Sequence, residues 1–197
     1  MSKGNLLVQL VYTEEGEVRL LHGPYLIYTM VSINEEVRCI GLLITQEDSE
    51  MPFYKFIDYA ELDFSLESLN HLDDYLDRVR KNKKKLNNNQ LMKVIIRCGT
   101  YLGEVIRKTN PKKFKWINYT QAYRISNKNG KKFLDYLGKD LTNSFILYDS
   151  KNFNFPLAKP LKFLENGRED SLIGFAMLCL GKAEKNKRYD IRKLKPV

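Results

Sequence analysis

One amphipathic segment, residues 90–109, constrains the fold of this chain more than any other. Its sequence, QLMKVIIRCGTYLGEVIRKT, repeats apolar residues with the spacing of one helix face, at Leu91, Val94, Ile95, Cys98, Leu102, Val105 and Ile106. Gly99 and Gly103 lie four residues apart, so they share one flank of that helix. Each glycine inside a helix costs about 1 kcal/mol relative to alanine. We therefore expect a neighbouring backbone to approach this flank closely.

Blocks of strands and helices surround this segment. The first 45 residues predict antiparallel strands at 5–12, 17–21, 25–33 and 37–45, and further strands are expected within 116–125 and at 143–148. Residues 155–164 contain two prolines, which indicate a sheet edge or a loop. A helix is predicted to begin at the N-cap Ser65 and to bury a stripe of apolar residues, which are Leu66, Leu69, Leu72, Leu76 and Val79.

The end of the chain predicts one more helix, from about residue 169 to residue 185, opened by a capping box at 166–169. Its middle, LIGFAMLCL, is apolar on nearly every side, which is typical of an enclosed helix. The order of blocks favours an α+β fold, with an N-terminal antiparallel meander, two central helices, a second group of strands and a buried C-terminal helix. With 197 residues, the chain fits one continuous domain, or a small β-rich acidic module (1–60) beside an α+β core domain with a basic surface (61–197).

Charge is distributed unevenly along the chain. Residues 1–77 carry 4 Lys or Arg against 15 Asp or Glu, whereas residues 78–115 carry 13 against 1. The formal net charge of +9 therefore combines an acidic first part with a basic remainder. Such asymmetry indicates either binding to a partner or charge complementarity within the fold.

The three cysteines, Cys39, Cys98 and Cys179, each lie in an apolar context, so we expect them to be buried and reduced in a cytoplasmic protein. No apolar run reaches the roughly 20 residues that span a bilayer, and the N-terminus resembles a strand more than a signal peptide. With His22 and His71 far apart, we expect no metal site. The sequence contains no familiar catalytic or cofactor-binding motif, so we expect no cofactor and no enzymatic activity.

Glu104 is the single acid between residues 78 and 115, and it shares one side of the helix with residues 97, 100 and 108. One interpretation is a surface glutamate paired with Lys108. A second is a polar strip that recognises a ligand or partner, and a third is an enzyme centred on Arg97, Tyr101 and Glu104. The candidate partner-binding residues are Arg97, Tyr101, Glu104, Lys108, Lys112, Lys113 and Trp116.

The basic and aromatic run at 107–124, RKTNPKKFKWINYTQAYR, suggests a nucleic-acid site. Its lysines would contact phosphates, and its aromatic rings would stack on bases of a single strand. The alternative is a solvated sheet edge whose rings belong to the core.

Three stretches resemble an uncharacterised bacterial family of small cytoplasmic proteins with a GxYLGEVI…W…FPLxKxxKFLENGxEDSL core, which is loosely associated with immunity proteins of interbacterial toxins. The stretches are LDFSLESLNHLDDYLDRVR, GTYLGEVIRKTNPKKFKW and FPLAKPLKFLENGREDSLIGFA. The resemblance implies a non-enzymatic protein that binds a toxin or effector. It assigns no catalytic residue, and a nucleic-acid-binding protein that uses the region from Arg78 onward remains the alternative.

Overall fold

The computed structural model describes residues 9–12, 18–21, 32–128, 130, 134 and 140–182. Its strands are β1 (Gln9–Tyr12), β2 (Val18–Leu21), β3 (Lys115–Asn118), β4 (Phe145–Tyr148) and β5 (Phe153–Asn154). Its α-helices are α1 (Ile33–Leu42), α2 (Ser68–Lys81), α3 (Asn88–Thr109), α4 (Tyr119–Lys128), α6 (Ala158–Asn166) and α7 (Leu172–Leu180). Short 3-10 helices join them at η1 (Leu43–Thr45), η2 (Tyr54–Phe56), η3 (Tyr59–Glu61), η4 (Lys83–Lys85), η5 (Leu141–Asn143) and η6 (Gly167–Asp170).

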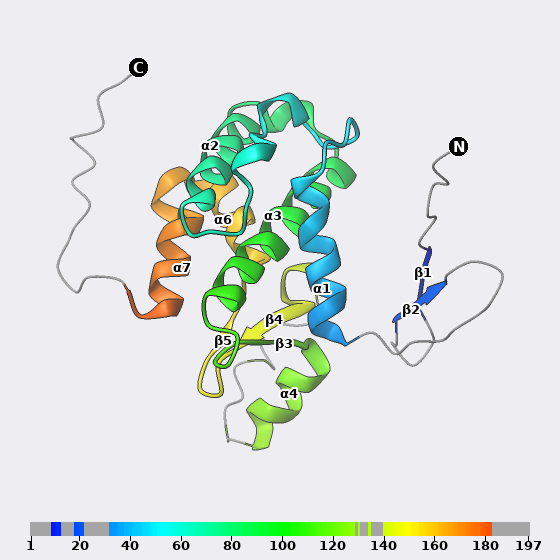
Figure 1. Ribbon diagram of the computed structural model, residues 1–197, viewed down its shortest axis with the longest axis vertical. Coiled ribbons are helices and arrows are strands. Elements are labelled where there is room, and N and C mark those ends of the chain that lie inside the picture. The colour runs from blue at the N-terminus through cyan, green and yellow to red at the C-terminus, as the bar shows by residue number, and fades with distance from the viewer. Residues whose placement is uncertain are drawn as a thin grey trace.

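Helix α3 is the centre of the molecule and confirms the amphipathic segment predicted from sequence. Helix α1 lies on one side of it, α2, α6 and α7 lie on the other, and the sheet with α4 lies beyond its C-terminal end (Figure 1). Six of the seven predicted apolar residues are buried, and Leu91 is partly buried. Asn87 is the N-cap of α3, and it forms a capping box with Gln90.

The two glycines of α3 mark close approaches, as expected. A Cβ atom added at Gly99 would lie 2.6 Å from the backbone Cα of Leu157, so a neighbouring backbone does pack on this flank. At Gly103 the neighbour is instead the indole ring of Trp116. The missing side chains therefore let the start of α6 and the strand β3 pack directly on the central helix.

Helix α2 also follows the prediction. Leu69, Leu72, Leu76 and Val79 are fully buried, although the helix begins at Ser68 and not directly after Ser65. The Ser65 hydroxyl accepts a hydrogen bond from the Ser68 amide at 3.1 Å, so it still caps the first turn.

The strand predicted at 37–45 is wrong, because these residues form most of α1 and η1. Ser32 caps α1 through a hydrogen bond from the Glu35 amide, and Glu35 and Glu36 lie in the positive first turn. Ile33, Val37 and Ile44 follow a helical period and pack into the core. The β-branched composition favoured a strand, but the cap and the spacing favour a helix.

The N-terminal meander is therefore not formed as predicted. The expected hairpin is present as the antiparallel pair β1–β2, with Gln9 opposite Leu21 and Tyr12 opposite Val18. Most of the third expected strand, 25–33, lies outside the described residues. Within the described range, Val37, Ile44, Met51 and Ile57 belong to the same buried cluster as α2 and α3. Residues 32–60 thus pack with the second part of the chain.

The three-stranded antiparallel sheet has the order β3–β4–β5, and Trp116 is opposite Leu147 in its register. The strand predicted at 143–148 is confirmed by β4. The segment 116–125 is a strand only at its start, because α4 begins at Tyr119. The Asn118 side-chain oxygen accepts from the Gln121 amide at 2.8 Å, and the Gln121 side-chain oxygen accepts from the Asn118 amide at 3.1 Å. This reciprocal cap marks the start of a helix, whereas the aromatic composition of the segment had favoured a strand.

Residues 155–164 are not an extended edge, because most of them belong to α6. Pro160 occupies the first turn of this helix, where the missing amide hydrogen would have no intrahelical partner. The next helix, α7, is capped by the Ser171 hydroxyl, which accepts from the Gly174 amide at 3.1 Å, and not by the box expected at 166–169.

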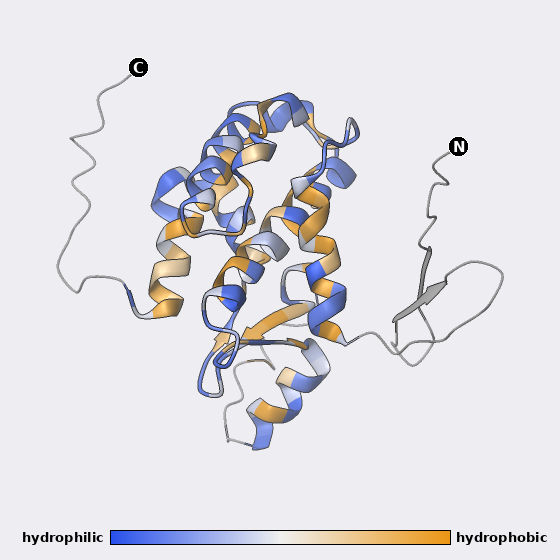
Figure 2. Cartoon of the chain, in the orientation of Figure 1, coloured by the Kyte–Doolittle hydropathy of each residue, from blue (hydrophilic) through white to orange (hydrophobic). Residues whose placement is uncertain are grey.

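The prediction that α7 is enclosed is also wrong. Figure 2 shows that α7 is apolar along most of its length although it lies on the outside of the bundle. Leu172 and Ala176 are buried, whereas Leu178 is 68% exposed. Helix α7 therefore packs on α2 and α3 with only part of its surface.

Internal pairing accounts for part of the charge asymmetry. Four ion pairs join acidic residues of the first 77 positions to basic residues of the later part of the chain. They are Asp48–Arg97, Glu50–Lys93, Asp74–Arg168 and Asp77–Arg168. Charge complementarity within the fold is thus one use of the acidic segment.

Candidate functional site

The seven residues predicted to bind a partner do not form one surface. Tyr101, Glu104 and Trp116 are buried in the interior, whereas the cationic members of the set reach the surface. The Tyr101 hydroxyl accepts from the Phe64 amide at 2.9 Å and lies 2.7 Å from the Ser68 hydroxyl, and its ring stacks on Phe64. These contacts tie the start of α2 to α3.

Glu104 is completely buried, so the interpretation as a surface glutamate paired with Lys108 is wrong. Its partner is Arg107, whose Nε and Nη2 donate to the two carboxylate oxygens at 2.7 and 2.8 Å. The indole Nε1 of Trp116 donates to Oε1 at 2.7 Å. Three charge-assisted hydrogen bonds thus compensate the burial of this carboxylate.

This arrangement joins three elements. Trp116 belongs to β3, and its backbone amide donates to Oδ1 of Asn34 in α1 at 2.8 Å. A Cβ atom added at Gly41 of α1 would lie 3.4 Å from Cγ of Glu104, so α1 packs directly against this side chain. We call Asn34, Glu104, Arg107 and Trp116 the Glu104 network. It has the geometry of a structural clamp between α1, α3 and β3.

The enzyme interpretation requires Arg97, Tyr101 and Glu104 to share a pocket. In the described part of the chain, each has a separate set of partners, and Arg97 binds Asp48 at 2.7 Å. Among these three, only Arg97 lines the described cavity. The structure therefore does not bring the three groups together.

Lys108, Lys112 and Lys113 lie near the C-terminal end of α3. Lys108 Nζ is 3.5 Å from the centre of the Phe64 ring, and partial burial lowers the pKa of Lys108. Lys113 Nζ donates to the carbonyl oxygen of Cys179 at 3.3 Å. Lys108 is eleven residues from Arg97, which corresponds to about 16 Å along the helix axis. The set therefore divides into two distant groups.

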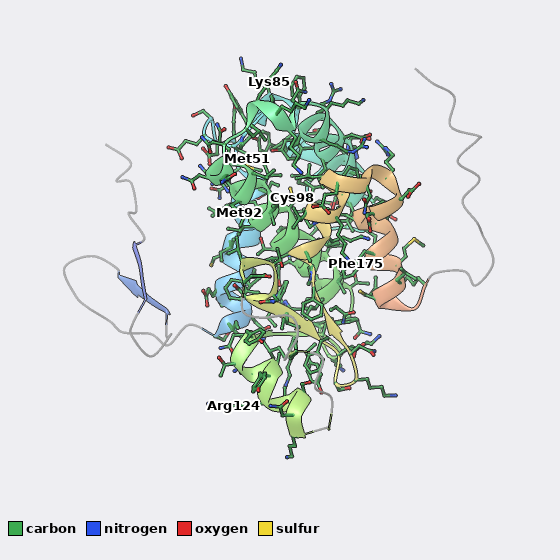
Figure 3. All side chains as sticks on the ribbon, turned by 180° about the vertical axis from the view of Figure 1, so that it is seen from behind. Met51, Lys85, Met92, Cys98, Arg124 and Phe175 are labelled. Atoms are coloured by element: carbon green, nitrogen blue, oxygen red, sulfur yellow. The ribbon has the colours of Figure 1, made fainter. Side chains whose placement is uncertain are left out.

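The surface around Arg97 is concave. An open cavity of about 290 Å³ lies between α1 and α3, and its lining residues are Ile40, Leu43, Asn89, Met92, Lys93, Ile96 and Arg97. We call it the α1–α3 groove. Figure 3 shows Met92 of α3 beside α1. Apolar side chains form most of its surface, and two cations line it as well.

Sequence reasoning found Arg97 but missed the rest of this groove. Residues 40 and 43 were expected to belong to a strand, so they could not be placed beside α3. Their helical spacing after the Ser32 cap is the signal that would have found them. The cysteine prediction also needs correction, since Cys39 on α1 is exposed, Cys179 is partly buried and Cys98 is buried.

A buried carboxylate connects α7 to α2. Asp73 of α2 accepts a hydrogen bond from the Leu172 amide at 2.8 Å, at the N-terminus of α7. The pKa of Asp73 is raised to about 7, mainly by burial and to a smaller extent by nearby Asp74, against the lowering effects of the Leu172 and Ile173 amides and of the charge of Arg168. Asp73 therefore changes its charge near neutral pH at the point where α7 is attached.

The titration of Asp73 predicts a pH dependence of stability. Its pKa is raised on folding from about 3.8, so the folded state retains a proton that the unfolded state loses. The contribution to stability is fully present below about pH 4 and is lost as pH rises through about 7, by up to about 4 kcal/mol. Urea denaturation near pH 5 and near pH 8 measures the part of this loss that occurs above pH 5, about 3 kcal/mol.

Asp73→Asn is the matched variant for this measurement, because it keeps an oxygen acceptor for the Leu172 amide but does not titrate. Relative to the wild type, the variant is expected to gain stability as the pH is raised from about 5 to about 8. A stability difference that is equal at both pH values would contradict this role for Asp73.

No known protein family, curated protein or solved structure that was compared with the chain matches it. The resemblance to the toxin-immunity family therefore stays a prediction. Within the described residues, no cluster of three or more His, Cys, Asp or Glu side chains could hold a metal ion. None of the helices described is long and apolar enough to span a bilayer.

Proposed function

We propose that the chain is a protein-binding protein, of the immunity type that holds a toxin or effector, and that the α1–α3 groove receives its partner. The observation that carries the proposal is the groove itself, an open and mainly apolar concavity on the surface of a folded domain. Leu43 at its edge is 44% exposed. Exposed apolar side chains gathered in a concave surface with charged neighbours are typical of protein interfaces.

The chemistry of the partner follows from the charges around the groove. Its two cations, Lys93 and Arg97, already bind Glu50 and Asp48, at 2.8 and 2.7 Å. These ion pairs hold the acidic loop that contains Glu47 beside the groove. Glu36 lies on the same face of α1 as residues 40 and 43. With both cations already paired, the other charged side chains beside the groove, Glu36 and Glu47, are acidic.

We accordingly propose a partner that inserts an apolar side chain flanked by Lys or Arg. The apolar side chain would fill the centre of the groove, and the flanking cations would face the acidic loop. Complementary charges around an apolar anchor increase the association rate and select the partner. The three free cysteines support a reducing compartment, so we propose that the encounter takes place in the cytoplasm.

Leu43→Asp is expected to lower the affinity for the partner about tenfold or more, because it places a charge at the apolar contact. The full chain is immobilised, and the partner it retains from the source-cell extract is quantified. A photoreactive group on Cys39, the exposed cysteine beside the groove, then identifies the contacted peptide. We expect that peptide to contain an apolar residue next to Lys or Arg.

Leu178→Asp is the matched control, since it adds the same charge at the exposed apolar residue of α7. It is expected to retain the partner as the wild type does. If both variants, or neither, lose the partner, the groove is not the binding surface. A cross-linked peptide without basic residues would contradict the proposed chemistry.

A further inference from the structure

Basic side chains are concentrated where α2 ends and α3 begins. Within eight consecutive positions lie Arg78, Arg80, Lys81, Lys83, Lys84 and Lys85, and we call this set the basic tip. Three of them lie in the last turn of α2, and the other three form the turn η4 (Lys83–Lys85). Figure 3 places Lys85 at one extremity of the molecule. All six are exposed or partly exposed.

The fold leaves most of this charge uncompensated. The side chains of Lys81, Lys83, Lys84 and Lys85 make no hydrogen bond, ion pair or ring contact within the described residues. Elsewhere the same chain pairs its cations, as in Asp48–Arg97. Arg80 has an internal role, because its guanidinium packs 3.2 Å from a Cβ added at Gly167. Like charges held together without counterions raise the local potential and attract anions.

The backbone that carries the lysines is held in place. The Lys85 amide donates to the Asn82 carbonyl at 2.9 Å, and the Leu86 amide donates to the Lys83 carbonyl at 3.1 Å. Leu86 packs against the core, and Asn87 then caps α3. The positive end of the 22-residue helix α3 therefore lies directly beside the lysines and adds to their field.

An exposed aromatic ring adjoins the basic tip. Phe56 is 51% exposed, and the guanidinium carbon of Arg78 lies 4.7 Å from its ring centre. Aromatic rings and guanidinium planes are the groups on which unpaired bases stack, next to cations that follow the phosphate backbone. A carboxylate-rich protein partner would match the lysines but would not use the exposed ring.

The segment proposed from sequence for this role does not have these properties. Phe114 and Trp116 are buried, so two of its rings cannot stack on bases. Lys113 is engaged with Cys179 and lies 3.8 Å from Asp149. Four neighbouring lysines without side-chain contacts in the described residues, next to an exposed ring that Arg78 contacts, occur instead near the N-terminal end of α3.

We propose that the basic tip, together with Phe56, binds single-stranded nucleic acid through its phosphates and one stacked base. The site is distinct from the binding face assigned to the α1–α3 groove and does not depend on that assignment. Lys81, Lys83, Lys84 and Lys85 contact phosphates, and the Phe56–Arg78 pair holds the base. Recognition of this kind has little dependence on sequence and a strong dependence on salt.

The test measures binding of a labelled oligouridylate to the full chain by fluorescence anisotropy over a series of salt concentrations. The triple variant Lys83→Glu, Lys84→Glu, Lys85→Glu is expected to weaken binding about tenfold or more at low salt. The slope of log affinity against log salt should fall by about 2, since each single-strand phosphate contact contributes about 0.7. Phe56→Ala should weaken binding and leave that slope unchanged.

The matched control is the triple variant Lys112→Glu, Lys128→Glu, Lys182→Glu, which makes the same charge change at exposed lysines without side-chain contacts in the described residues. It should bind at least severalfold more tightly than the variant of the basic tip. Equal losses in both triple variants, or no binding by the wild type at low salt, would overturn the proposal. If polyglutamate competes as well as unlabelled oligouridylate, the tip binds acidic protein instead. Circular dichroism confirms that each variant is folded.

Discussion

Gly103→Ala is expected to lower the free energy of unfolding by about 3 kcal/mol, the upper part of the range for overpacking a core. The added Cβ atom would lie less than 3.0 Å from the ring carbons Cζ2 and Cη2 of Trp116. It would also lie 3.2 Å from Cγ of Pro156. Both neighbours are large, and Trp116 is fully enclosed, so the new methyl group has no space to occupy.

Trp116 cannot move away without breaking other contacts. Its indole nitrogen donates to the buried carboxylate of Glu104 at 2.7 Å, and its backbone amide donates to Asn34 at 2.8 Å. Alanine is favoured over glycine inside a helix by about 1 kcal/mol, so the clash must exceed that gain for the variant to be less stable. The glycine is therefore explained by the ring and not by a need for backbone flexibility.

Chemical denaturation of the two proteins measures the effect, and Gly41→Ala is the control. Gly41 is also a buried helical glycine, but a Cβ atom added there would meet its nearest neighbours at 3.4 Å, an ordinary contact. Its substitution is expected to change stability by less than about 1 kcal/mol, since helix propensity and packing nearly cancel. If Gly103→Ala proves as stable as Gly41→Ala, the close packing of Trp116 on α3 is wrong.

The long helices could be predicted from sequence because one physical effect dominates each of them. Over 14 residues in α2 and 22 in α3, a repeated apolar face leaves little ambiguity about the period. The flank marked by Gly99 was predictable for a similar reason, because two costly glycines in register need a close neighbour. The identity of that neighbour, the backbone at Leu157, depends on tertiary packing and was not predictable.

The short segments failed for the opposite reason. Residues 37–45 are rich in β-branched and apolar residues, and in such short runs composition does not distinguish a buried strand from a buried helix. The decisive signals were local caps, at Ser32 for α1 and at Asn118 for α4. In α7 the composition indicated burial, but burial depends on whether another element covers the helix, which no local pattern encodes.

The candidate site was misjudged because burial is a tertiary property. Glu104 was expected to be a surface residue on account of its basic neighbours in sequence. Gly41 of α1 and Trp116 of β3 enclose it, and the partner is Arg107 three residues later rather than Lys108 four residues later. What the sequence did indicate was that this acid is unusual in a basic segment, and its buried position accounts for that.

Removing the Glu104 carboxylate is expected to be among the most damaging single changes in the chain. Glu104→Leu should lower the free energy of unfolding by about 3–5 kcal/mol, the usual result of removing one partner of a buried ion pair. Arg107 would lose the carboxylate to which it donates two hydrogen bonds, and the indole nitrogen of Trp116 would lose its acceptor. Leucine fills much of the volume, so the loss reports polar contacts more than an empty cavity.

Glu35→Leu is the exposed counterpart of this change, because Glu35 and Arg38 form the same glutamate–arginine pair at the same helical spacing. That pair is 45% and 43% exposed, whereas Glu104 is fully buried, so solvent can replace its contacts. Exposed pairs contribute about 0–1 kcal/mol, and the control should therefore unfold close to the wild type. Urea denaturation of both variants measures the contrast, and equal losses would show that the Glu104 network contributes no more than a surface pair.

Glu104→Gln separates the two contacts of the network. A glutamine oxygen can still accept from the Trp116 indole, but the charge of Arg107 loses its hydrogen-bonded counterion. If Trp116 is the more important contact, this variant should recover most of the stability lost in Glu104→Leu; if the charge of Arg107 matters more, it should recover little. The position of Arg107, whose side chain is 19% exposed, favours the first outcome, because its guanidinium can reach water while the indole cannot.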